Sequence, residues 1–243
     1  MQTEHDIITA KLGRHSELDE QDIAVLRTLP VQSRRLRPNE DFIRQGDKPK
    51  VSALVTSGMV ARYHLLRGGR RQYLSFHLTG DLPDAQTLFI ERMDHAVCAI
   101  GDATIALIPH EKICGMFERR PQVGFAIWRE TLIDAAIFRE AITNKSSRPA
   151  MTRMAHLFCE LYYRARASGL AKPGACMLPF HQGQIGEALA MSIVTVNRTI
   201  QALRRTRAME FRNGILTVFD WKKLTEVGDF DPNYLNLKKP ARL

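Results

Sequence analysis

The sequence has few of the features that mark a metalloprotein, a secreted protein or a membrane protein. Its 4 cysteines are scattered singly and form neither a C-x-x-C pair nor a cysteine–histidine cluster with zinc spacing. No apolar run approaches the ~20 residues that a membrane-spanning helix requires, and residues 1–20 are too polar and acidic for a signal peptide. We therefore expect a cytoplasmic protein with no metal site and no membrane partner. A redox role is the less favoured alternative to buried, reduced thiols at Cys98, Cys114, Cys159 and Cys176.

The length, the apolar fraction and the positive net charge of the chain are the informative features of its composition. With 243 residues it can form one large domain or two smaller ones. Its hydrophobic fraction of 44% is ample for a packed core, which excludes a disordered chain. The net charge of +9 favours a polyanionic partner such as a nucleic acid.

Residues 181–207 carry the strongest pattern in the sequence. They read as two short helices joined by a tight turn, with Ser192 as the N-cap of the second helix. From there Val196, Ile200 and Leu203 recur at i, i+4 and i+7 and form one narrow apolar stripe. The opposite face is polar and basic, since residues 192–207 contain four arginines and no acid.

Such a helix is in most proteins a solvated surface helix, but here its neighbours favour a helix-turn-helix. A short helix, a three-residue turn, a capped second helix and a hairpin around Asn213-Gly214 follow in the order that the motif requires. A helix anchored by one stripe, with polar and basic groups on its other face, suits the major groove of DNA. The predicted DNA-binding residues are His181, Gln182, Ser192, Val194, Thr195, Asn197, Arg198, Gln201 and Arg205.

The N-terminal half predicts a β domain. A helix that opens at Ser16 ends before Pro30. Beyond it, short runs that alternate or are β-branched are separated by glycines, and Gly68-Gly69 between two runs is a strong hairpin signal. We expect a compact antiparallel roll or barrel with strands at Val31–Leu36, Val51–Thr56, Met59–Leu66, Arg71–His77, Ala96–Ile100 and Thr104–Ile108.

The middle of the chain predicts a long helix that is apolar on nearly all sides. After a short helix over His110–Arg119, Pro121 is the expected first residue of a helix that runs to about Thr143. A helix without a polar face has to be covered on both sides. One side can pack on the β roll, and for the other we favour a second copy of the same helix in a parallel coiled-coil-like dimer. The alternative is a central helix within one large core.

Residues 144–149 break the helical pattern. Pro149 disfavours the α conformation at Arg148, so we expect a hinge and a domain boundary here. The elements expected beyond the hinge are an amphipathic helix over Met151–Ser168, a strand at Cys176–Phe180, the helix-turn-helix, a hairpin of Met209–Arg212 and Ile215–Phe219, and a helix over Trp221–Val227.

Several short motifs occur in the order known from one protein family. The motifs Ser57-Gly58, Gly80-Asp81-Leu82 and His95-Ala96 precede Gly183-Gln184-Ile185-Gly186 and the segment from Ser192 to Arg198. In these motifs the chain resembles the CRP/FNR superfamily of bacterial transcription regulators, and its C-terminal segment is similar to an alphaproteobacterial branch. The resemblance implies an α+β fold in three parts: an antiparallel β-roll sensor like the cyclic-nucleotide-binding domain (1–120), a long dimerisation helix with its hinge (121–146), and a winged helix-turn-helix domain (147–243).

The sensor departs from the family pattern at the residues that bind a cyclic nucleotide. Members that bind one close the phosphate site with a glycine–glutamate pair and an arginine, whereas this chain has Asp84-Ala85 and Asp94 at these places. An anion that faces Asp94 without a nearby cation would be repelled, so we expect no physiological affinity for cAMP or cGMP. The candidate effector pocket contains Gly80, Asp81, Asp84, Ala85, Asp94 and His95.

The sequence predicts no cofactor. The segment before Val31 contains no cysteine, which excludes the iron–sulfur cluster of the oxygen-sensing branch of the family. His64, His77 and His95 leave haem open, although lone histidines in a β domain are mostly ordinary polar residues.

The predicted reading helix also departs from the family pattern. Many members have an arginine and a glutamate directly after the cap serine, where this chain has Ile193 and Val194. Val194 can contact only a thymine methyl, Asn197 can pair with adenine, and Arg198, which matches the family's arginine, is the best candidate for a guanine contact. Ala190 replaces the usual turn glycine. We therefore expect a DNA site that differs from the family's common palindrome.

These features predict a homodimeric, sequence-specific transcription regulator that is not an enzyme. Its expected partners are double-stranded DNA at a pseudo-palindrome, a second copy bound through residues 121–143, and RNA polymerase. An enzyme would need a convergent catalytic cluster, and no motif ties Asp81, Asp84, Asp94 or His95 to a reaction. A regulatory module that acts on a protein is the remaining alternative. Only a DNA-binding regulator should combine steep salt dependence with a sequence preference.

Overall fold

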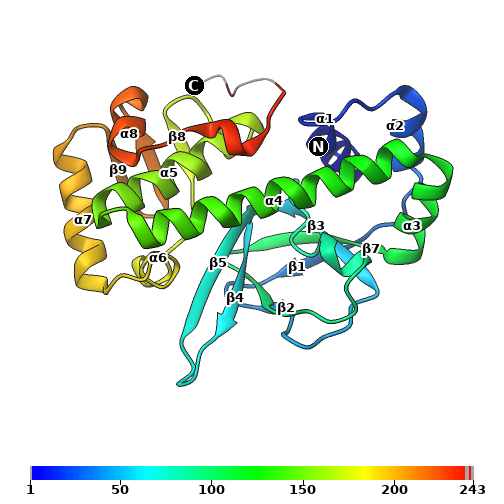
Figure 1. Ribbon diagram of the computed structural model, residues 1–243, viewed down its shortest axis with the longest axis horizontal. Coiled ribbons are helices and arrows are strands. Elements are labelled where there is room, and N and C mark those ends of the chain that lie inside the picture. The colour runs from blue at the N-terminus through cyan, green and yellow to red at the C-terminus, as the bar shows by residue number, and fades with distance from the viewer. Residues whose placement is uncertain (1, 239–240, 242–243) are drawn as a thin grey trace.

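The structure is a computed structural model that describes residues 2–238 and 241. One long helix, α4 (Pro121–Ser147), runs across the molecule from the N-terminal β domain to the C-terminal helical domain (Figure 1). The β sheets lie along one side of α4, and α3 (His110–Arg119) leads into it. The predicted order of β domain, long helix and helix-turn-helix domain is confirmed.

The β domain consists of two antiparallel sheets that form the predicted roll. Their strand orders are β1-β7-β3 and β2-β6-β4-β5. All six predicted strands are present with ends within one residue of those expected, and only the three-residue β2 was missed. The strands are β1 (Gln32–Leu36), β2 (Asp41–Ile43), β3 (Val51–Ser57), β4 (Met59–Leu65), β5 (Arg71–Leu78), β6 (Ala96–Ala99) and β7 (Ala103–Pro109).

Glycine is required at two of the turns in this roll. Gly68 and Gly69 have φ values of 96° and 80°, a left-handed conformation that closes the predicted hairpin between β4 and β5. Gly58 joins β3 to β4, and a Cβ at this position would lie 2.3 Å from the Asp102 carbonyl oxygen. The spacing of these glycines therefore sets where the strands reverse.

The N-terminal segment forms two helices where the sequence predicts one. Helix α1 (Glu4–Gly13) was missed because it buries only Ile8 and Leu12, although Thr3 and Asp6 form a capping box at its start. Helix α2 (Glu20–Leu26) is capped by Asp19 and does not begin at Ser16.

Helix α4 continues beyond the predicted hinge. It begins with Pro121 as expected but is helical through Ser147, and only Arg148, with φ −94° and ψ 143°, leaves the helical region. Two contacts tie its last turns to α5 (Ala150–Ala167), since Asn144 donates to the Arg153 carbonyl and Arg153 donates to the Lys145 carbonyl. The helical pattern is therefore broken only at Arg148 and Pro149 and not over all of residues 144–149, where the hinge was predicted.

The C-terminal domain packs four helices around a small antiparallel sheet of order β8-β10-β9. The predicted two-residue turn is present, with positive φ at Asn213 and Gly214. The strand expected at Cys176–Phe180 is shorter than predicted. Besides α5, the elements are β8 (Ala175–Met177), α6 (Gln182–Leu189), α7 (Ile193–Arg205), β9 (Met209–Arg212), β10 (Ile215–Val218), α8 (Trp221–Gly228) and η2 (Pro232–Leu235).

The two domains share one hydrophobic core. Phe76 of β5 packs edge-on against Phe180, with ring centroids 4.8 Å apart. The buried cluster around this pair extends from Met59 in β4 to Leu216 in β10, and Gln72 of β5 donates to the Glu187 carbonyl of α6. The C-terminal domain is thus packed directly on the β4–β5 side of the roll.

Candidate nucleic-acid interface and sensor cavity

Helices α6 and α7 form the predicted helix-turn-helix, and a side chain caps each of them. The Ser192 hydroxyl accepts the Thr195 N–H at 3.1 Å, as predicted. His181 caps α6 through a reciprocal pair of hydrogen bonds with Gln184, at 3.3 and 3.0 Å. This second cap was not predicted because histidine is not among the usual N-cap residues. It fixes the His181 ring at the start of α6, where phosphate contact is predicted.

The turn between the helices is left-handed and carries strain. Ala190 has φ 53° and ψ 50°, a conformation that costs a residue with a Cβ about 1–2 kcal/mol. Gly186 accepts the Met191 N–H at 2.9 Å. A Cβ at Gly186 would lie 2.7 Å from the Met191 carbonyl oxygen, so this glycine allows the close turn that Ala190 completes.

Helix α7 has one buried and one exposed face, as its stripe predicts. Val196, Ile200 and Leu203 are buried, and α7 packs against both α5 and α6. Among the described residues neither Arg198 nor Arg205 has an ion-pair partner, so both guanidinium groups are available. The exposed residues of α7 are Ile193, Val194, Asn197, Arg198, Gln201, Arg204 and Arg205.

A groove of about 720 Å³ lies between the start of α6, helix α7 and the β9–β10 hairpin. Four of the predicted DNA-binding residues line it: His181, Gln182, Asn197 and Gln201. The groove also has basic and polar side chains that sequence reasoning missed. The missed residues are Arg204, Arg212 and Asn213. The sequence predicted a hairpin turn at Asn213-Gly214, but it did not predict that this turn lies beside α7.

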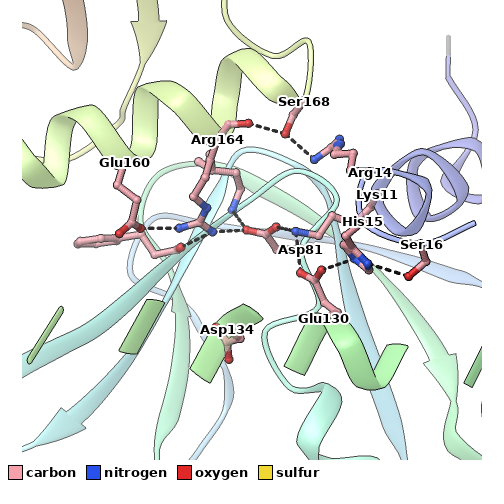
Figure 2. Close-up of polar contacts among 12 residues, drawn as sticks. Lys11, Arg14, His15, Ser16, Asp81, Glu130, Asp134, Glu160, Arg164 and Ser168 are labelled. Carbon is pink, nitrogen blue, oxygen red and sulfur yellow. Dashed lines mark hydrogen bonds and ion pairs between the residues drawn. The ribbon is translucent and has the colours of Figure 1, made fainter. Parts of the chain in front are cut away.

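The β domain contains a cavity that its own charged side chains nearly fill. It lies between the roll, α1, α4 and α5, and its volume is about 50 Å³. Asp81 is at its centre, where its carboxylate accepts hydrogen bonds from Lys11, Arg164 and the Leu78 N–H, each at 2.7 Å (Figure 2). Burial alone would raise the pKa of Asp81, but Lys11 and Arg164 hold it well below its usual range.

A second buried acid extends this cluster along α4. Glu130 binds Lys11 at 2.6 Å and His15 at 2.8 Å. Burial would raise the pKa of Glu130, but Lys11 and His15 lower it overall. Arg14, directly after α1, donates to Ser168, directly after α5, at 2.6 Å. Ionic contacts therefore join α1, the turn after β5, α4 and α5.

Arg164 carries this cluster into the C-terminal domain. It lies on α5, where it also binds Glu160 at 3.0 Å. Burial would lower the pKa of Arg164, but Asp81 and Glu160 raise it above its ordinary value. A cation from the C-terminal domain thus lines the sensor cavity.

The six predicted pocket residues do not gather at one site. Asp81 and Ala85 line the cavity, and Gly80 forms the turn beside α1 with φ 98°. The side chain of Asp94 is 80% exposed and pairs with His95 at 2.8 Å. The prediction that Asp94 would repel an anion in the pocket is therefore wrong, because this carboxylate faces solvent. The prediction that no cation lies near the pocket is also wrong. Four basic side chains line the cavity: Lys11, Arg14, Arg62 and Arg164.

Asp84 lies outside the cavity and holds the segment after β5 against β3. Its carboxylate is buried and accepts the Ala53 N–H at 2.9 and 3.1 Å. Desolvation raises the pKa of Asp84 to about 7. Desolvation and Arg62 lower the pKa of His95 to about 4, so this imidazole is neutral at physiological pH.

The cysteines are free thiols, and Cys98, Cys159 and Cys176 are buried. Burial raises the pKa of Cys98 and of Cys176 to about 11, which keeps both protonated. Among residues 2–238 and 241, no group of three histidine, cysteine or acidic side chains is placed to hold a metal ion. Within the same residues no helix is both long and apolar enough to cross a membrane.

Two family models match the chain. The model of the Crp-like helix-turn-helix domain matches residues 152–227, and that of the cyclic nucleotide-binding domain matches residues 33–120. The fumarate and nitrate reduction regulatory protein of Vibrio cholerae is 23% identical over 212 residues, which cover 87% of this chain and 82% of the relative. This chain belongs to the CRP/FNR superfamily of transcription regulators.

Other relatives agree with this assignment. The transcriptional activator protein FnrA of Stutzerimonas stutzeri is 23% identical over 203 residues, covering 84% of this chain and 83% of FnrA. The solved structure of FixK2 from Bradyrhizobium japonicum has the same fold, with a TM-score of 0.72 at 24% identity. That match covers 82% of this chain and 98% of FixK2. In this CRP/FNR regulator, the helix-turn-helix is the DNA-binding part.

Proposed function

We propose that this CRP/FNR regulator acts as a homodimer that inserts two copies of α7 into successive major grooves of a pseudo-palindromic site. The observation that carries the proposal is the exposed polar and basic face of α7, in which Arg198 and Arg205 have no ion-pair partner among the described residues. The half-site centres would lie about one helical turn of DNA, ~34 Å, apart. The protein would act where bacterial DNA lies, in the cytoplasm.

The exposed face of α4 supports the dimer. Phe125, Trp128 and Leu132 are 54%, 57% and 51% exposed, and large apolar side chains at such exposure on one helix face mark an interaction site. With Ala135 and Ile142 they follow one another at steps of three, four, three and seven residues, which is the spacing of a coiled-coil seam with Arg139 at the position between Ala135 and Ile142. The opposite face of α4 is already packed on the chain's own core. This spacing is suited to packing against α4 of a second copy of the chain.

Replacing Leu132 with glutamate should dissociate the dimer. In a parallel coiled coil each Leu132 faces its copy, so the variant would bring two carboxylates together in an apolar seam. We expect the dissociation constant, measured by sedimentation, to rise at least about 10-fold, which corresponds to ~1.4 kcal/mol. Leu65→Glu on the β4–β5 hairpin, at a position that is 61% exposed, is the matched control. A dimer that is unchanged by Leu132→Glu would show that α4 is not the interface.

The exposed side chains of α7 would read the DNA. We propose that Arg198 contacts a guanine, Asn197 an adenine and Val194 a thymine methyl. The start of α6, with His181 and Gln182, would bind phosphate, helped by the helix dipole. Val194 lies in the first turn of α7, which Ser192 caps, and its side chain is 74% exposed, which supports this assignment.

Arg198→Ala should weaken binding by about 1–3 kcal/mol and relax preference at one base pair of each half-site. The measurement is fluorescence anisotropy with a set of half-sites that carry every single-base change. Arg205→Ala on the last turn of the same helix is the control, because a phosphate contact should weaken all sequences equally and reduce the salt dependence. If Arg198→Ala also weakened all sequences equally, the base contact would be wrong.

We propose that DNA binding requires no cyclic nucleotide. Ligand pockets commonly have volumes of about 300–1,000 Å³, whereas this cavity has about 50 Å³. Entry of a ligand would separate Asp81 from Lys11 and Arg164, which are buried ion pairs.

Calorimetric titration of the full-length protein with cAMP or cGMP should therefore show no saturable heat at micromolar ligand. Titration of buffer gives the blank. Saturable micromolar binding of either nucleotide would overturn the proposal, because it would mean that the ion pairs open at small cost.

We also propose that the dimer contacts RNA polymerase at its promoters. The relative from Stutzerimonas stutzeri is named a transcriptional activator, and an activator of this kind needs such a contact. Co-sedimentation with RNA polymerase on a promoter fragment tests it, and the absence of a ternary complex would count against it.

A further inference from the structure

A turn of the β roll touches the start of helix α6. The turn joins β1 to β2, and the side-chain oxygen of its Asn39 accepts a hydrogen bond from Gln184 at 3.3 Å. Gln184 lies in the first turn of α6 and is the residue that forms the reciprocal cap with His181. The end of α6 that is proposed to bind phosphate is therefore in direct contact with the sensor domain.

A second turn of the roll and the β9–β10 hairpin contact the segment that leads into α6. Gly101, between β6 and β7, lies so close to Pro179 that a Cβ at Gly101 would be 3.0 Å from the proline Cβ. From the hairpin, the Gly214 carbonyl accepts the Leu178 N–H at 2.7 Å. The roll, the hairpin and the start of α6 therefore meet around residues 178–184.

The strand that leads into the Asn39 turn carries exposed arginines. Arg35 lies on β1 and Arg37 directly after it, and both are exposed. Leu36 between them is buried, and Pro38 favours an extended conformation at Arg37. Because side chains two residues apart in an extended chain point to the same side, the two guanidinium groups lie on one side of the roll. Within the described part of the chain neither of them forms an ion pair.

The acidic side chains beside this strand do not neutralise it. Glu40 pairs with Arg34 at 2.9 Å and accepts the backbone N–H of Arg37 at 2.9 Å. Asp102, in the β6–β7 turn, is exposed and forms no ion pair among the residues that the structure describes. Two unpaired arginines therefore outnumber one unpaired carboxylate. With the exposed Arg212 of the hairpin, the surface around the start of α6 is basic.

We propose that Arg35 and Arg37 bind phosphates of the DNA that extends beyond each half-site, so that the sensor domain is itself part of the DNA interface. The inference rests on the DNA binding proposed above. The roll packs on the buried face of α4, through Ile133 and Ile137, which is opposite the proposed dimer seam. It therefore lies away from the dimer axis, beside the outer DNA. Phosphate contacts add affinity but carry no sequence information.

Two DNA duplexes test this proposal. Both contain one palindromic site that the unaltered full-length protein has selected from random sequence. The shorter duplex ends at the half-sites, and the longer one extends about 10 base pairs, one helical turn, beyond each of them. Fluorescence anisotropy should show tighter binding to the longer duplex and a steeper dependence of that binding on salt.

The double variant Arg35→Gln/Arg37→Gln should lose this advantage. We expect it to bind the longer duplex about 10-fold more weakly than the unaltered protein and the shorter duplex equally well. Each lost phosphate contact lowers the slope of log K against log salt concentration by about 0.9, so the four lost in the dimer should lower it by about 3–4. Hydroxyl-radical footprinting should show backbone protection outside the half-sites that the variant lacks.

Arg119→Gln is the matched control for the loss of charge. Arg119 is an exposed arginine of α3, and α3 and α6 lie towards opposite ends of the molecule (Figure 1). This variant should bind both duplexes like the unaltered protein. Because Arg35 and Arg37 are exposed and form no ion pair among the described residues, the double variant should fold, which its circular dichroism spectrum checks.

The outcomes separate this inference from the proposed function. Equal affinity of the unaltered protein for the two duplexes would overturn the inference and leave the binding of α7 to the half-sites intact. An unchanged affinity and salt slope of the double variant on the longer duplex would also overturn it. If that variant then failed to co-sediment with RNA polymerase, the basic surface would bind the polymerase instead. Failure to select any site would reject the proposed function, and this inference with it.

Discussion

Replacing Arg164 with methionine is expected to lower the free energy of unfolding by about 3–5 kcal/mol, the range for a buried ion pair that loses one partner. Arg164 is bound to Asp81 at 2.7 Å and to Glu160 at 3.0 Å. In the variant Asp81 keeps Lys11, but Glu160 loses its cation inside the protein. The methionine fills much of the space, so the loss comes mainly from uncompensated charge.

Urea denaturation at pH 7 measures this effect. Arg119→Met is the control, because Arg119 is on the exposed face of α3 and, within the described part of the chain, donates only to the Gly115 carbonyl, at 3.1 Å. We expect the control to change the free energy of unfolding by less than about 0.5 kcal/mol. A loss below about 1 kcal/mol in Arg164→Met would show that water replaces the lost cation and that the cluster does not hold the domains together.

Replacing Asp84 with asparagine is expected to stabilise the protein at alkaline pH and to leave it unchanged at pH 4. The pKa of Asp84 is about 7 in the folded chain, against about 3.9 for an unfolded aspartate. The folded state therefore favours the protonated acid. The stabilisation that protonated Asp84 gives to the folded state, measured as free energy of unfolding, is complete below pH ~4 and is lost as the pH rises through 7.

The gap between the two pKa values corresponds to about 4 kcal/mol. Asparagine does not titrate, and its Oδ1 can still accept the Ala53 N–H. The variant should therefore exceed the parent protein by about 2–4 kcal/mol at pH 8, measured by urea denaturation at a series of pH values. A constant difference between Asp84→Asn and the parent from pH 4 to 8 would mean that Asp84 ionises normally.

The DNA-binding end could be predicted from sequence because its determinants are local. Ser192 caps the residue three positions later, and Val196, Ile200 and Leu203 recur at helical spacing within one element. The turn at Asn213-Gly214 requires positive φ at two adjacent residues, and asparagine followed by glycine is the residue pair that favours this conformation. Each of these signals lies within a few residues of the structure that it forms.

The sensor end could not be predicted in the same way, because its determinants are distant in sequence. Lys11, Asp81, Glu130 and Arg164 come from four different elements, and the helix that carries Lys11 was missed. A charge in a sequence is usually a solvated surface group, and only the folded chain shows that these four are buried together. The prediction that Asp94 faces the pocket was wrong for a related reason, because its position in the sequence did not reveal the direction of its side chain.

The packing of Phe76 on Phe180 has a consequence for the evolution and engineering of this regulator. Families with a sensor and a separate effector domain can diversify by exchanging one module for another. Here the two domains share one apolar core. A chimera with the β roll of another protein would therefore need a side chain that packs on Phe180 and a donor that replaces Gln72 in its contact with α6. A chimera joined at Arg148–Pro149 is therefore expected to lose stability unless its roll restores these contacts.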